Sequence, residues 1–250
     1  MKQKPIQHLS FRYGDEIIDF ERVDKAINKA TNNGKILIKV HPNCRVVVSA
    51  PRHVTDDDVM KATAKRSRWI YQQLRQFREQ QAHITPRQYV SGESHYYLGK
   101  QYQLKVLIQP NEKQGIKLLR GKIEISARQK DSQLVKKLLE EWYKARAKIV
   151  FAKRLDVVLE QTLWVKERPP FRILTMKTQW GSCSPKGLLT LNPYLVKTPT
   201  LCIDYVILHE LCHIAEHNHS ERFYQLLTRV MPEWEKIKTR LDSMVVKYID

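Results

Sequence analysis

The sequence predicts an α+β protein of two lobes, and three patterns along its 250 residues support this. Short strand-like and helix-like segments alternate over the first 130 residues, as in α+β proteins. A long helical repeat begins at Asp131. A β-hairpin pattern then leads directly into an apolar helix that carries two histidines. We therefore expect an N-terminal α+β lobe over residues 1–130 and a second lobe over residues 131–250, built from a small sheet and the histidine-bearing helix.

Local patterns predict the elements of the N-terminal lobe. Residues 20–30 have the pattern of a short helix. Residues 35–40 and 45–50 alternate apolar and polar side chains around a turn, so they predict a β-hairpin. Thr55, followed by three aspartates, predicts the N-cap of a helix that reaches about residue 80, because negative charge is favourable at a helix N-terminus. Residues 96–125 predict a further small sheet.

The second lobe begins with a predicted helix capped by Asp131, whose apolar residues follow helical spacing to about Leu159. Residues 171–174 and 187–192 predict strands, the second of them in a hairpin just before the apolar helix. After that helix, Ser220 is expected to cap a short amphipathic helix, and Pro232 separates it from a last one.

The apolar helix carries the pattern H-E-x-x-H at His209, Glu210 and His213. Thr198 is expected as its N-cap and Pro199 as its first residue. Two histidines four apart lie on the same face of a helix, so their neutral imidazoles can bind one Zn²⁺ and leave a position open. Glu210 is placed where a general base for a zinc-bound water belongs. The alternative is a buried helix whose histidines bond to core groups, but it leaves a buried glutamate unexplained.

The third metal ligand has more than one candidate. His217 lies on the same face if the helix continues, whereas His219 requires the helix to break and the chain to fold back. Asn218 is a residue type that tolerates the left-handed conformation of such a break. Spacing favours His219, and the carboxylates of Glu216 and Glu221 are weaker candidates.

The chain is strongly basic, with a net charge of +18 and a pI near 9.8. Residues 100–186 contain 20 Lys or Arg and 8 Asp or Glu, which is +12 of that charge. A basic region predicts an anionic partner, above all nucleic acid. The alternative is a basic surface without a dedicated partner, because no nucleic-acid-binding motif accompanies it.

Composition also bears on location. No apolar run approaches the roughly 18–20 residues that cross a bilayer, so no membrane partner is expected. No apolar segment of a signal peptide follows Met1. Four cysteines without a C-x-x-C pair are expected to be reduced thiols. These features predict a cytoplasmic protein.

Five motifs surround the two histidines. They are Trp180-Gly181-Ser182-Cys183-Ser184, Leu191-Asn192, Asp204-Tyr205-Val206, His209-Glu210-Leu211-Cys212-His213, and Asn218-His219-Ser220 with Phe223. Over about residues 170–235 they resemble the YgjP-type family of predicted zinc metallopeptidases, which is more distantly similar to the SprT-like and WLM peptidases. Tyr97-Leu98-Gly99 and Val48-Ser49-Ala50-Pro51 resemble the N-terminal half of that family more loosely.

The resemblance implies a zincin-like fold for the second lobe. It also implies zinc ligands at His209, His213 and His219, with Glu210 as the catalytic residue, and so favours His219 over His217. SprT-like and WLM peptidases cleave proteins linked to DNA, so DNA-associated proteins are one substrate class that the analogy offers.

Together these features predict a zinc metallopeptidase that holds one Zn²⁺ per chain and cleaves protein or peptide substrates. Zinc would lower the pKa of a water molecule toward 7, and Glu210 would take its proton. Two alternatives stay open. One is a nucleic-acid-binding protein with a structural metal site, although such sites are usually closed and rich in cysteine. The other is a zinc hydrolase of a non-peptide amide or ester.

Overall fold

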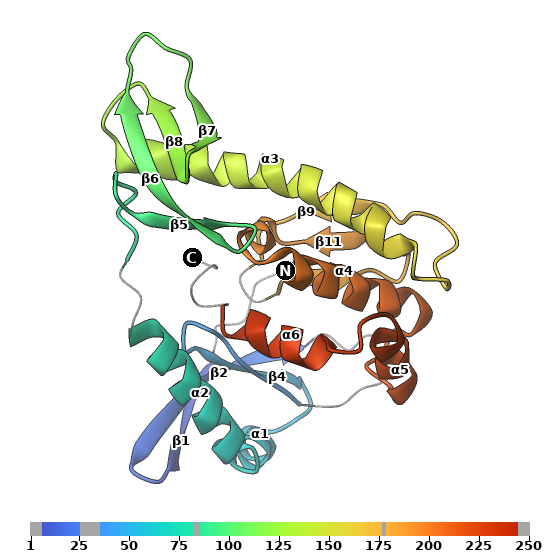
Figure 1. The fold of residues 1–250 in the computed structure, drawn as a ribbon. Helices are drawn as coiled ribbons and strands as arrows, with labels where there is room; N and C mark the ends of the chain where they lie inside the picture. Colours follow the sequence, from blue (N-terminus) through green and yellow to red (C-terminus); the bar gives the residue numbers. More distant parts are fainter. Residues whose placement is uncertain (1–6, 26–35, 83–85, 177–178, 245–250) are drawn as a thin grey trace. The chain divides into compact units, whose positions relative to one another are not determined.

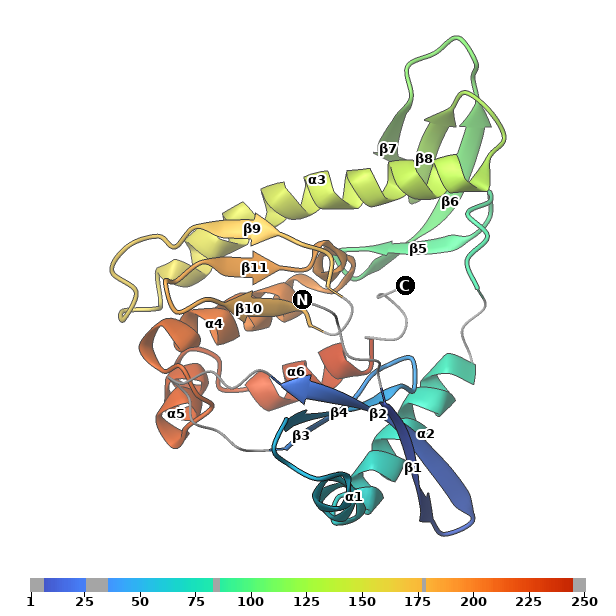
Figure 2. The ribbon, with the colours of Figure 1, turned by 180° about the vertical axis from the view of Figure 1, so that it is seen from behind.

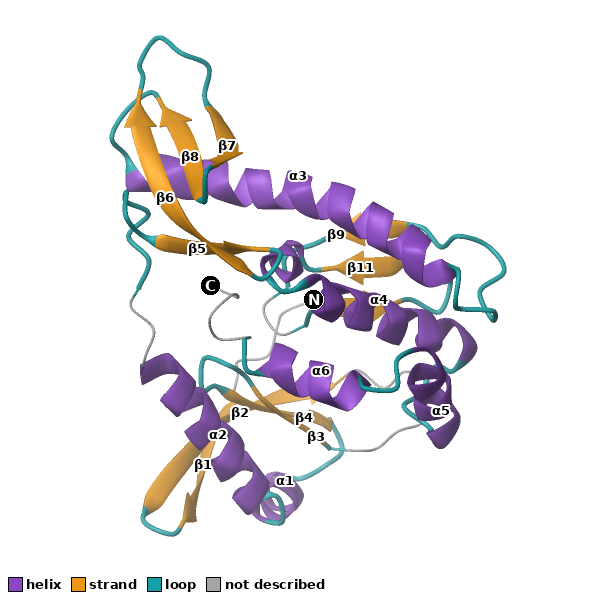
Figure 3. Ribbon diagram, in the orientation of Figure 1, coloured by secondary structure: helices purple, strands orange, loops and turns teal. Residues whose placement is uncertain are grey.

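The computed structural model describes residues 7–25, 36–82, 86–176 and 179–244, and the chain divides into two compact units, Met1–Ile84 and Thr85–Asp250. The described residues form six α-helices and three small sheets, which Figure 3 distinguishes by colour. The α+β class predicted from the sequence is therefore confirmed. Within these ranges, no helix is long and apolar enough to cross a membrane.

The first unit is a four-stranded sheet followed by two helices. The strand order is β1-β2-β4-β3, with a parallel pair at its centre and an antiparallel pair on each side. Its buried side chains include Phe11, Phe20, Val48, Ile70 and Leu74, so sheet and helices share one core. The elements are β1 (Gln7–Tyr13), β2 (Glu16–Lys25), β3 (Leu37–Val40), β4 (Val46–Pro51), α1 (Asp56–Ala64) and α2 (Ser67–Ala82).

Three features of this unit test the sequence predictions. The hairpin expected over residues 35–50 is confirmed, because β3 pairs antiparallel with β4. Thr55 caps α1 as expected, with its hydroxyl oxygen 3.2 Å from the backbone nitrogen of Asp58. The short helix expected over residues 20–30 is wrong where the structure describes it, since residues 16–25 are a strand between β1 and β4. Residues 26–30 lie outside the described part.

The second unit is organised along one long helix, α3. Figures 1 and 2 show the sheet β5–β8 against its first half, and the strands β9–β11 with α4 along its second half. The two sheets have the orders β5-β6-β8-β7 and β10-β11-β9. The elements are β5 (Ser94–Tyr97), β6 (Lys100–Ile108), β7 (Gly115–Leu119), β8 (Lys122–Ala127), α3 (Ser132–Leu159), β9 (Phe171–Ile173), β10 (Gly181–Cys183), β11 (Leu189–Leu191), a 3₁₀ helix (Pro193–Lys197), α4 (Thr200–Ala215), α5 (Glu221–Val230) and α6 (Trp234–Asp242).

The length of α3 follows from its apolar stripe. Asp131 caps the helix as predicted, with its carboxylate 2.8 Å from the backbone nitrogen of Gln133. Buried side chains recur at intervals of three or four residues, so the helix presents a continuous buried stripe to the core along most of its length. These side chains are Val135, Leu139, Tyr143, Ala147, Phe151, Leu155 and Val158.

The division between units falls at residue 84, whereas the sequence led us to expect it at residue 130. The sheet β5–β8 is the reason, because it packs in one core with α3 and α4. Its Leu98-Gly99 turn also donates backbone hydrogen bonds to the carbonyls of Val196 (2.8 Å) and Lys197 (3.1 Å). A Cβ on Gly99, which has a φ of +76°, would lie only 2.8 Å from Pro199. The sheet is thus attached at the start of α4.

A bidentate ion pair fastens α3 to α4. Arg154 Nε and Nη2 lie 2.7 and 2.8 Å from the two carboxylate oxygens of Asp204. The Asp204 side chain is 11% exposed and that of Arg154 is 24% exposed. Burial raises the pKa of Asp204, although the Arg154 guanidinium opposes that change. The carboxylate therefore depends on its partner to stay ionised inside the unit.

Arg154→Met should lower the free energy of unfolding by about 2 kcal/mol, because it leaves a buried carboxylate without its partner. Urea unfolding measures this change. The control is Arg168→Met on the exposed pair with Asp156, where the side chains are 45% and 59% exposed. That change should cost less than about 1 kcal/mol. Equal costs for the two variants would contradict a special role for the Arg154–Asp204 pair.

Candidate metal centre

The helix α4 is buried over most of its length. Ten of its side chains are buried, from Cys202 to Cys212 with only His209 partly exposed in that run. Its start differs by one residue from the prediction. Pro199 is the N-cap, and the Thr198 hydroxyl instead donates to the carbonyl of Leu195 (2.8 Å), so Thr198 closes the preceding 3₁₀ helix.

The chain folds back directly after α4. The helix stops because Glu216 takes an extended conformation, with φ −132° and ψ 103°. The left-handed residue expected at Asn218 is wrong, since Asn218 does not have a positive φ. Ser220 then caps α5 as predicted, and its hydroxyl accepts from the backbone nitrogen of Phe223 at 3.3 Å. This return brings His219 back toward α4.

Three histidine rings meet at this return. One ring nitrogen each from His209, His213 and His219 can be chosen so that all lie within 4.8 Å of one another. The Nε2 atoms of His209 and His219 are 3.0 Å apart. A tetrahedral zinc ion with bonds of about 2.0–2.1 Å holds two ligand nitrogens about 3.3 Å apart, so this spacing fits such an ion.

The protonation of these rings also fits a metal ion. Burial lowers the pKa of His209 to about 3, and the other two histidines add to this effect. Burial and His213 lower the pKa of His219 as well. His213 Nδ1 lies 3.1 Å from the carbonyl oxygen of Glu216, which only accepts, so this contact requires the proton on Nδ1 and leaves Nε2 as the ring nitrogen that could hold a metal ion. Neutral imidazoles with converging lone pairs are zinc ligands.

Two aromatic side chains support this group. The Phe223 ring is fully buried and lies 4.9, 4.7 and 4.8 Å from the rings of His209, His213 and His219. The indole nitrogen of Trp164 donates to the carbonyl oxygen of Leu211, inside the H-E-x-x-H segment, at 3.0 Å. The sequence predicts Phe223 as a motif residue on an amphipathic helix, but it predicts no role at the histidines for Phe223 or Trp164. Neither contact follows from spacing along the chain.

The other ligand candidates are not brought into the cluster among the described residues. His217 is exposed and is not part of the group. Glu216 pairs with Arg222 at 3.1 Å, and Glu221 bonds to the side chain of Gln225. Burial raises the pKa of the Cys212 thiol to about 12, so this cysteine stays a neutral packing residue.

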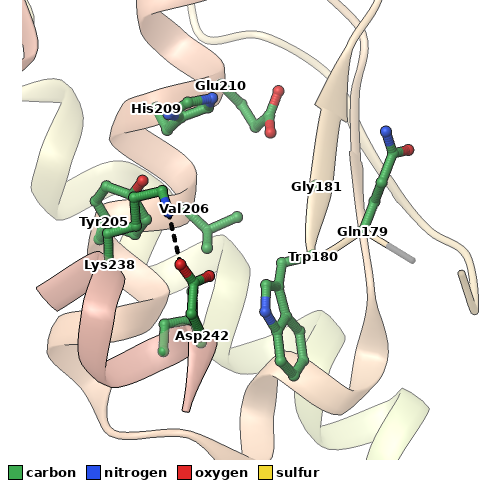
Figure 4. Close-up of a pocket in the computed structure, with 10 residues that line it drawn as sticks. Gln179, Trp180, Gly181, Tyr205, Val206, His209, Glu210, Lys238 and Asp242 are labelled. Atoms are coloured by element: carbon green, nitrogen blue, oxygen red, sulfur yellow. Dashed lines mark hydrogen bonds and ion pairs between the residues drawn. The ribbon is translucent and has the colours of Figure 1, made fainter. Parts of the chain in front are cut away.

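Glu210 lines a cavity of about 190 Å³ together with His209. Figure 4 shows the Glu210 carboxyl group between α4 and the strand β10. The residue is 5% exposed, and burial raises the pKa of its carboxyl group to about 8. A divalent cation held by the neighbouring histidines would lower this pKa, because it favours the charged form.

The strand β10 comes so close to α4 that a side chain at its first position would press on Glu210 and Val206. A Cβ on Gly181 would lie 2.8 Å from Glu210 Oε1 and 3.0 Å from Val206 Cγ1. The segment before this strand is held by Asn192, which is fully buried and whose amide donates to the carbonyls of Met176 (2.7 Å) and Gln179 (3.0 Å). Gly181 and Asn192 therefore fix the wall that faces Glu210.

A buried helix with H-E-x-x-H, a third histidine folded back onto it and a glutamate in the adjoining cavity define a metal-dependent hydrolase. Residues 34–244 match the family model described as YgjP-like, metallopeptidase domain. Because this match spans most of the chain, the protein belongs to the YgjP-like metallopeptidase family, and it is a metallopeptidase. The family resemblance found in the sequence is confirmed.

The chain was also compared with curated proteins and with solved structures. No curated protein matches it. The crystal structure of the metallopeptidase zymogen of Pyrococcus abyssi abylysin is 23% identical, with a TM-score of 0.32, over 38% of this chain and 90% of that one. The metallopeptidase zymogen of Methanocaldococcus jannaschii jannalysin is 27% identical, with a TM-score of 0.34, over 38% of this chain and 96% of that one.

Gly181→Ala should lower kcat for peptide cleavage by about 10- to 100-fold, because the added methyl group displaces the Glu210 carboxyl group. Metal content should stay at the wild-type value. Gly115→Ala is the matched control, since a Cβ there meets nothing within 4 Å and its φ is not positive. Steady-state kinetics and elemental mass spectrometry measure the two effects. If Gly181→Ala is as active as the control, the close approach is not needed for activity.

Proposed function

We propose that this metallopeptidase uses one zinc ion held by His209, His213 and His219, with Glu210 as general base. The convergence of the three histidine rings is the observation that carries the proposal. A zinc ion there would act as a Lewis acid toward a water molecule and the scissile carbonyl. Glu210, beside the first ligand and in the cavity, is placed to accept the water proton and pass it to the leaving amine.

We also propose that the second unit is zincin-like and that β10 guides the substrate. β10 is an edge strand of the sheet β10-β11-β9, and it lies against α4 beside Glu210. An extended peptide can add to such an edge through main-chain hydrogen bonds. A substrate bound in this way would run alongside the Glu210 carboxyl group, which favours peptide over a small ester or amide.

Nucleic acid is a further partner that we propose for the basic region 100–186. Lys137, Lys144 and Lys148 are exposed on α3, and none has an ion pair with another described residue. Helical spacing places the three on one face, where they can contact successive phosphates. Action on DNA-associated proteins and a cytoplasmic location also remain predictions.

A structural metal site in a nucleic-acid-binding protein is the less favoured alternative. Structural zinc sites have four protein ligands, whereas the described residues supply a group of three histidines. The membership of the chain in a metallopeptidase family also argues against this alternative.

Wild-type protein should contain one zinc ion per chain, and His219→Ala should lose most of it. His217→Ala is the matched control, because His217 lies two residues earlier and outside the cluster, so it should keep its zinc. Elemental mass spectrometry on the purified proteins measures the metal content. Equal zinc in the two variants would refute the ligand set, and a different metal in the wild type would refute the choice of zinc.

Glu210→Gln should keep its zinc and lose peptide cleavage, with kcat reduced on the order of 100- to 10,000-fold, because the amide cannot accept the proton. The control Glu221→Gln removes an exposed carboxylate near the same histidines and should be close to wild type. A peptide that the wild type cleaves serves as substrate. Wild-type kcat in Glu210→Gln would show that another group is the base.

A further inference from the structure

The cavity beside Glu210 has a second wall, formed by α6. Lys238, Leu241 and Asp242 line it there, and residues of α4 and β10 form the rest of the lining. With a volume of about 190 Å³ it is smaller than the roughly 300–1,000 Å³ of pockets for drug-sized ligands. It is therefore suited to one side chain. Because His209 and Glu210 line the same cavity, that side chain would belong to a residue next to the scissile bond.

The α6 wall carries an ion pair between a flexible side chain, Lys238, and a short one, Asp242. Lys238 Nζ lies 2.6 Å from Asp242 Oδ2, and Figure 4 shows this contact as a dashed line. The two side chains are 51% and 48% exposed, and exposed pairs of this kind contribute only about 0–1 kcal/mol. Lysine has a long flexible stem that can turn into solvent, whereas aspartate is short. The carboxylate is therefore the fixed group and the ammonium the exchangeable one.

The remaining lining suits a long cationic side chain. Leu241 and Val206 offer apolar surface for its methylene stem. Trp180 lines the cavity from the β10 side, where Figure 4 shows its indole ring next to Asp242, and an indole ring is the best aromatic partner for a cation. Glu210 adds a second carboxyl group to the lining. A substrate carboxylate would instead face both Asp242 and Glu210.

We propose that the α6 wall is a subsite for an arginine or lysine side chain of the substrate, adjacent to the bond that is cleaved. This inference rests on the proposed function, because it places the reaction beside His209 and Glu210. The substrate cation takes the place of the Lys238 ammonium on Asp242, and an arginine does so with two parallel hydrogen bonds. Lys238 makes a single contact with Asp242, so an arginine replaces one hydrogen bond by two, and the exchange favours the bound substrate.

The test uses peptides that differ at one position, with Arg, Lys, Gln, Leu or Glu placed in turn on each side of the scissile bond. At one of these positions, wild-type kcat/KM should be at least about tenfold higher for Arg or Lys than for Glu. Asp242→Asn should lower kcat/KM for the Arg peptide about tenfold and leave the Leu peptide within about twofold. Lys238→Met, which removes the competing ammonium, should raise kcat/KM for the Arg peptide.

Lys236→Met is the matched control for Lys238→Met. Lys236 is on the same helix, pairs with Glu233 at 2.6 Å and does not line the cavity, so its loss should not change the preference. A preference for Glu, or an Arg-to-Leu ratio that Asp242→Asn leaves unchanged, would overturn the subsite. If wild type cleaves the Leu peptide and Glu210→Gln does not, the proposed function stands even then. A wild type that cleaves no peptide would overturn both proposals.

Discussion

The burial of α4 is the constraint on which the rest of the second unit depends. This helix is enclosed by contacts from α3, β10, α5 and α6, so each polar side chain on it needs a partner or an opening. Asp204 has a partner, the guanidinium of Arg154. Glu210 and His209 line the cavity, and His213 contacts the carbonyl of Glu216 where the chain folds back. The acidic and histidine side chains of α4 that have no partner in the core therefore lie only where the helix meets the cavity or the return after Glu216.

The strand that faces Glu210 is positioned by groups distant in the sequence. Asn192 follows β11, yet its amide bonds to carbonyls before β10. Gly181 lets that strand approach α4 so closely that an added Cβ would displace the side chain of Glu210 or Val206. The position of the Glu210 carboxyl group therefore depends on backbone geometry that is set outside the helix. This packing explains why Gly181 and Asn192 occur in the short motifs quoted from the sequence: both residues fix the strand that faces Glu210.

The sequence predicts the structure best where that structure depends on residues close together along the chain. The spacing of His209 and His213, the cap at Asp131 and the stripe of α3 all follow from the period of a helix. The preference for His219 over His217 agrees with the cluster in the structure, although the ligands themselves remain a proposal. Long-range packing was not accessible in this way. The strand β2 between β1 and β4, the attachment of β5–β8 to α4 and the α6 wall all arise from contacts between distant segments.

Phe223 links the histidine cluster to the packing of α5 on α4. Its ring belongs to the hydrophobic core and also touches all three histidine rings. An ion that binds those rings therefore also favours the docking of α5 on α4, so ion affinity and the local stability of α5 are thermodynamically linked. For a single site, a free ion at 100 times its dissociation constant adds about 2.7 kcal/mol to the folded state. Removal of a bound ion by a chelator would then loosen the packing of α5 on α4, and proteolysis or hydrogen exchange in α5 would measure that change.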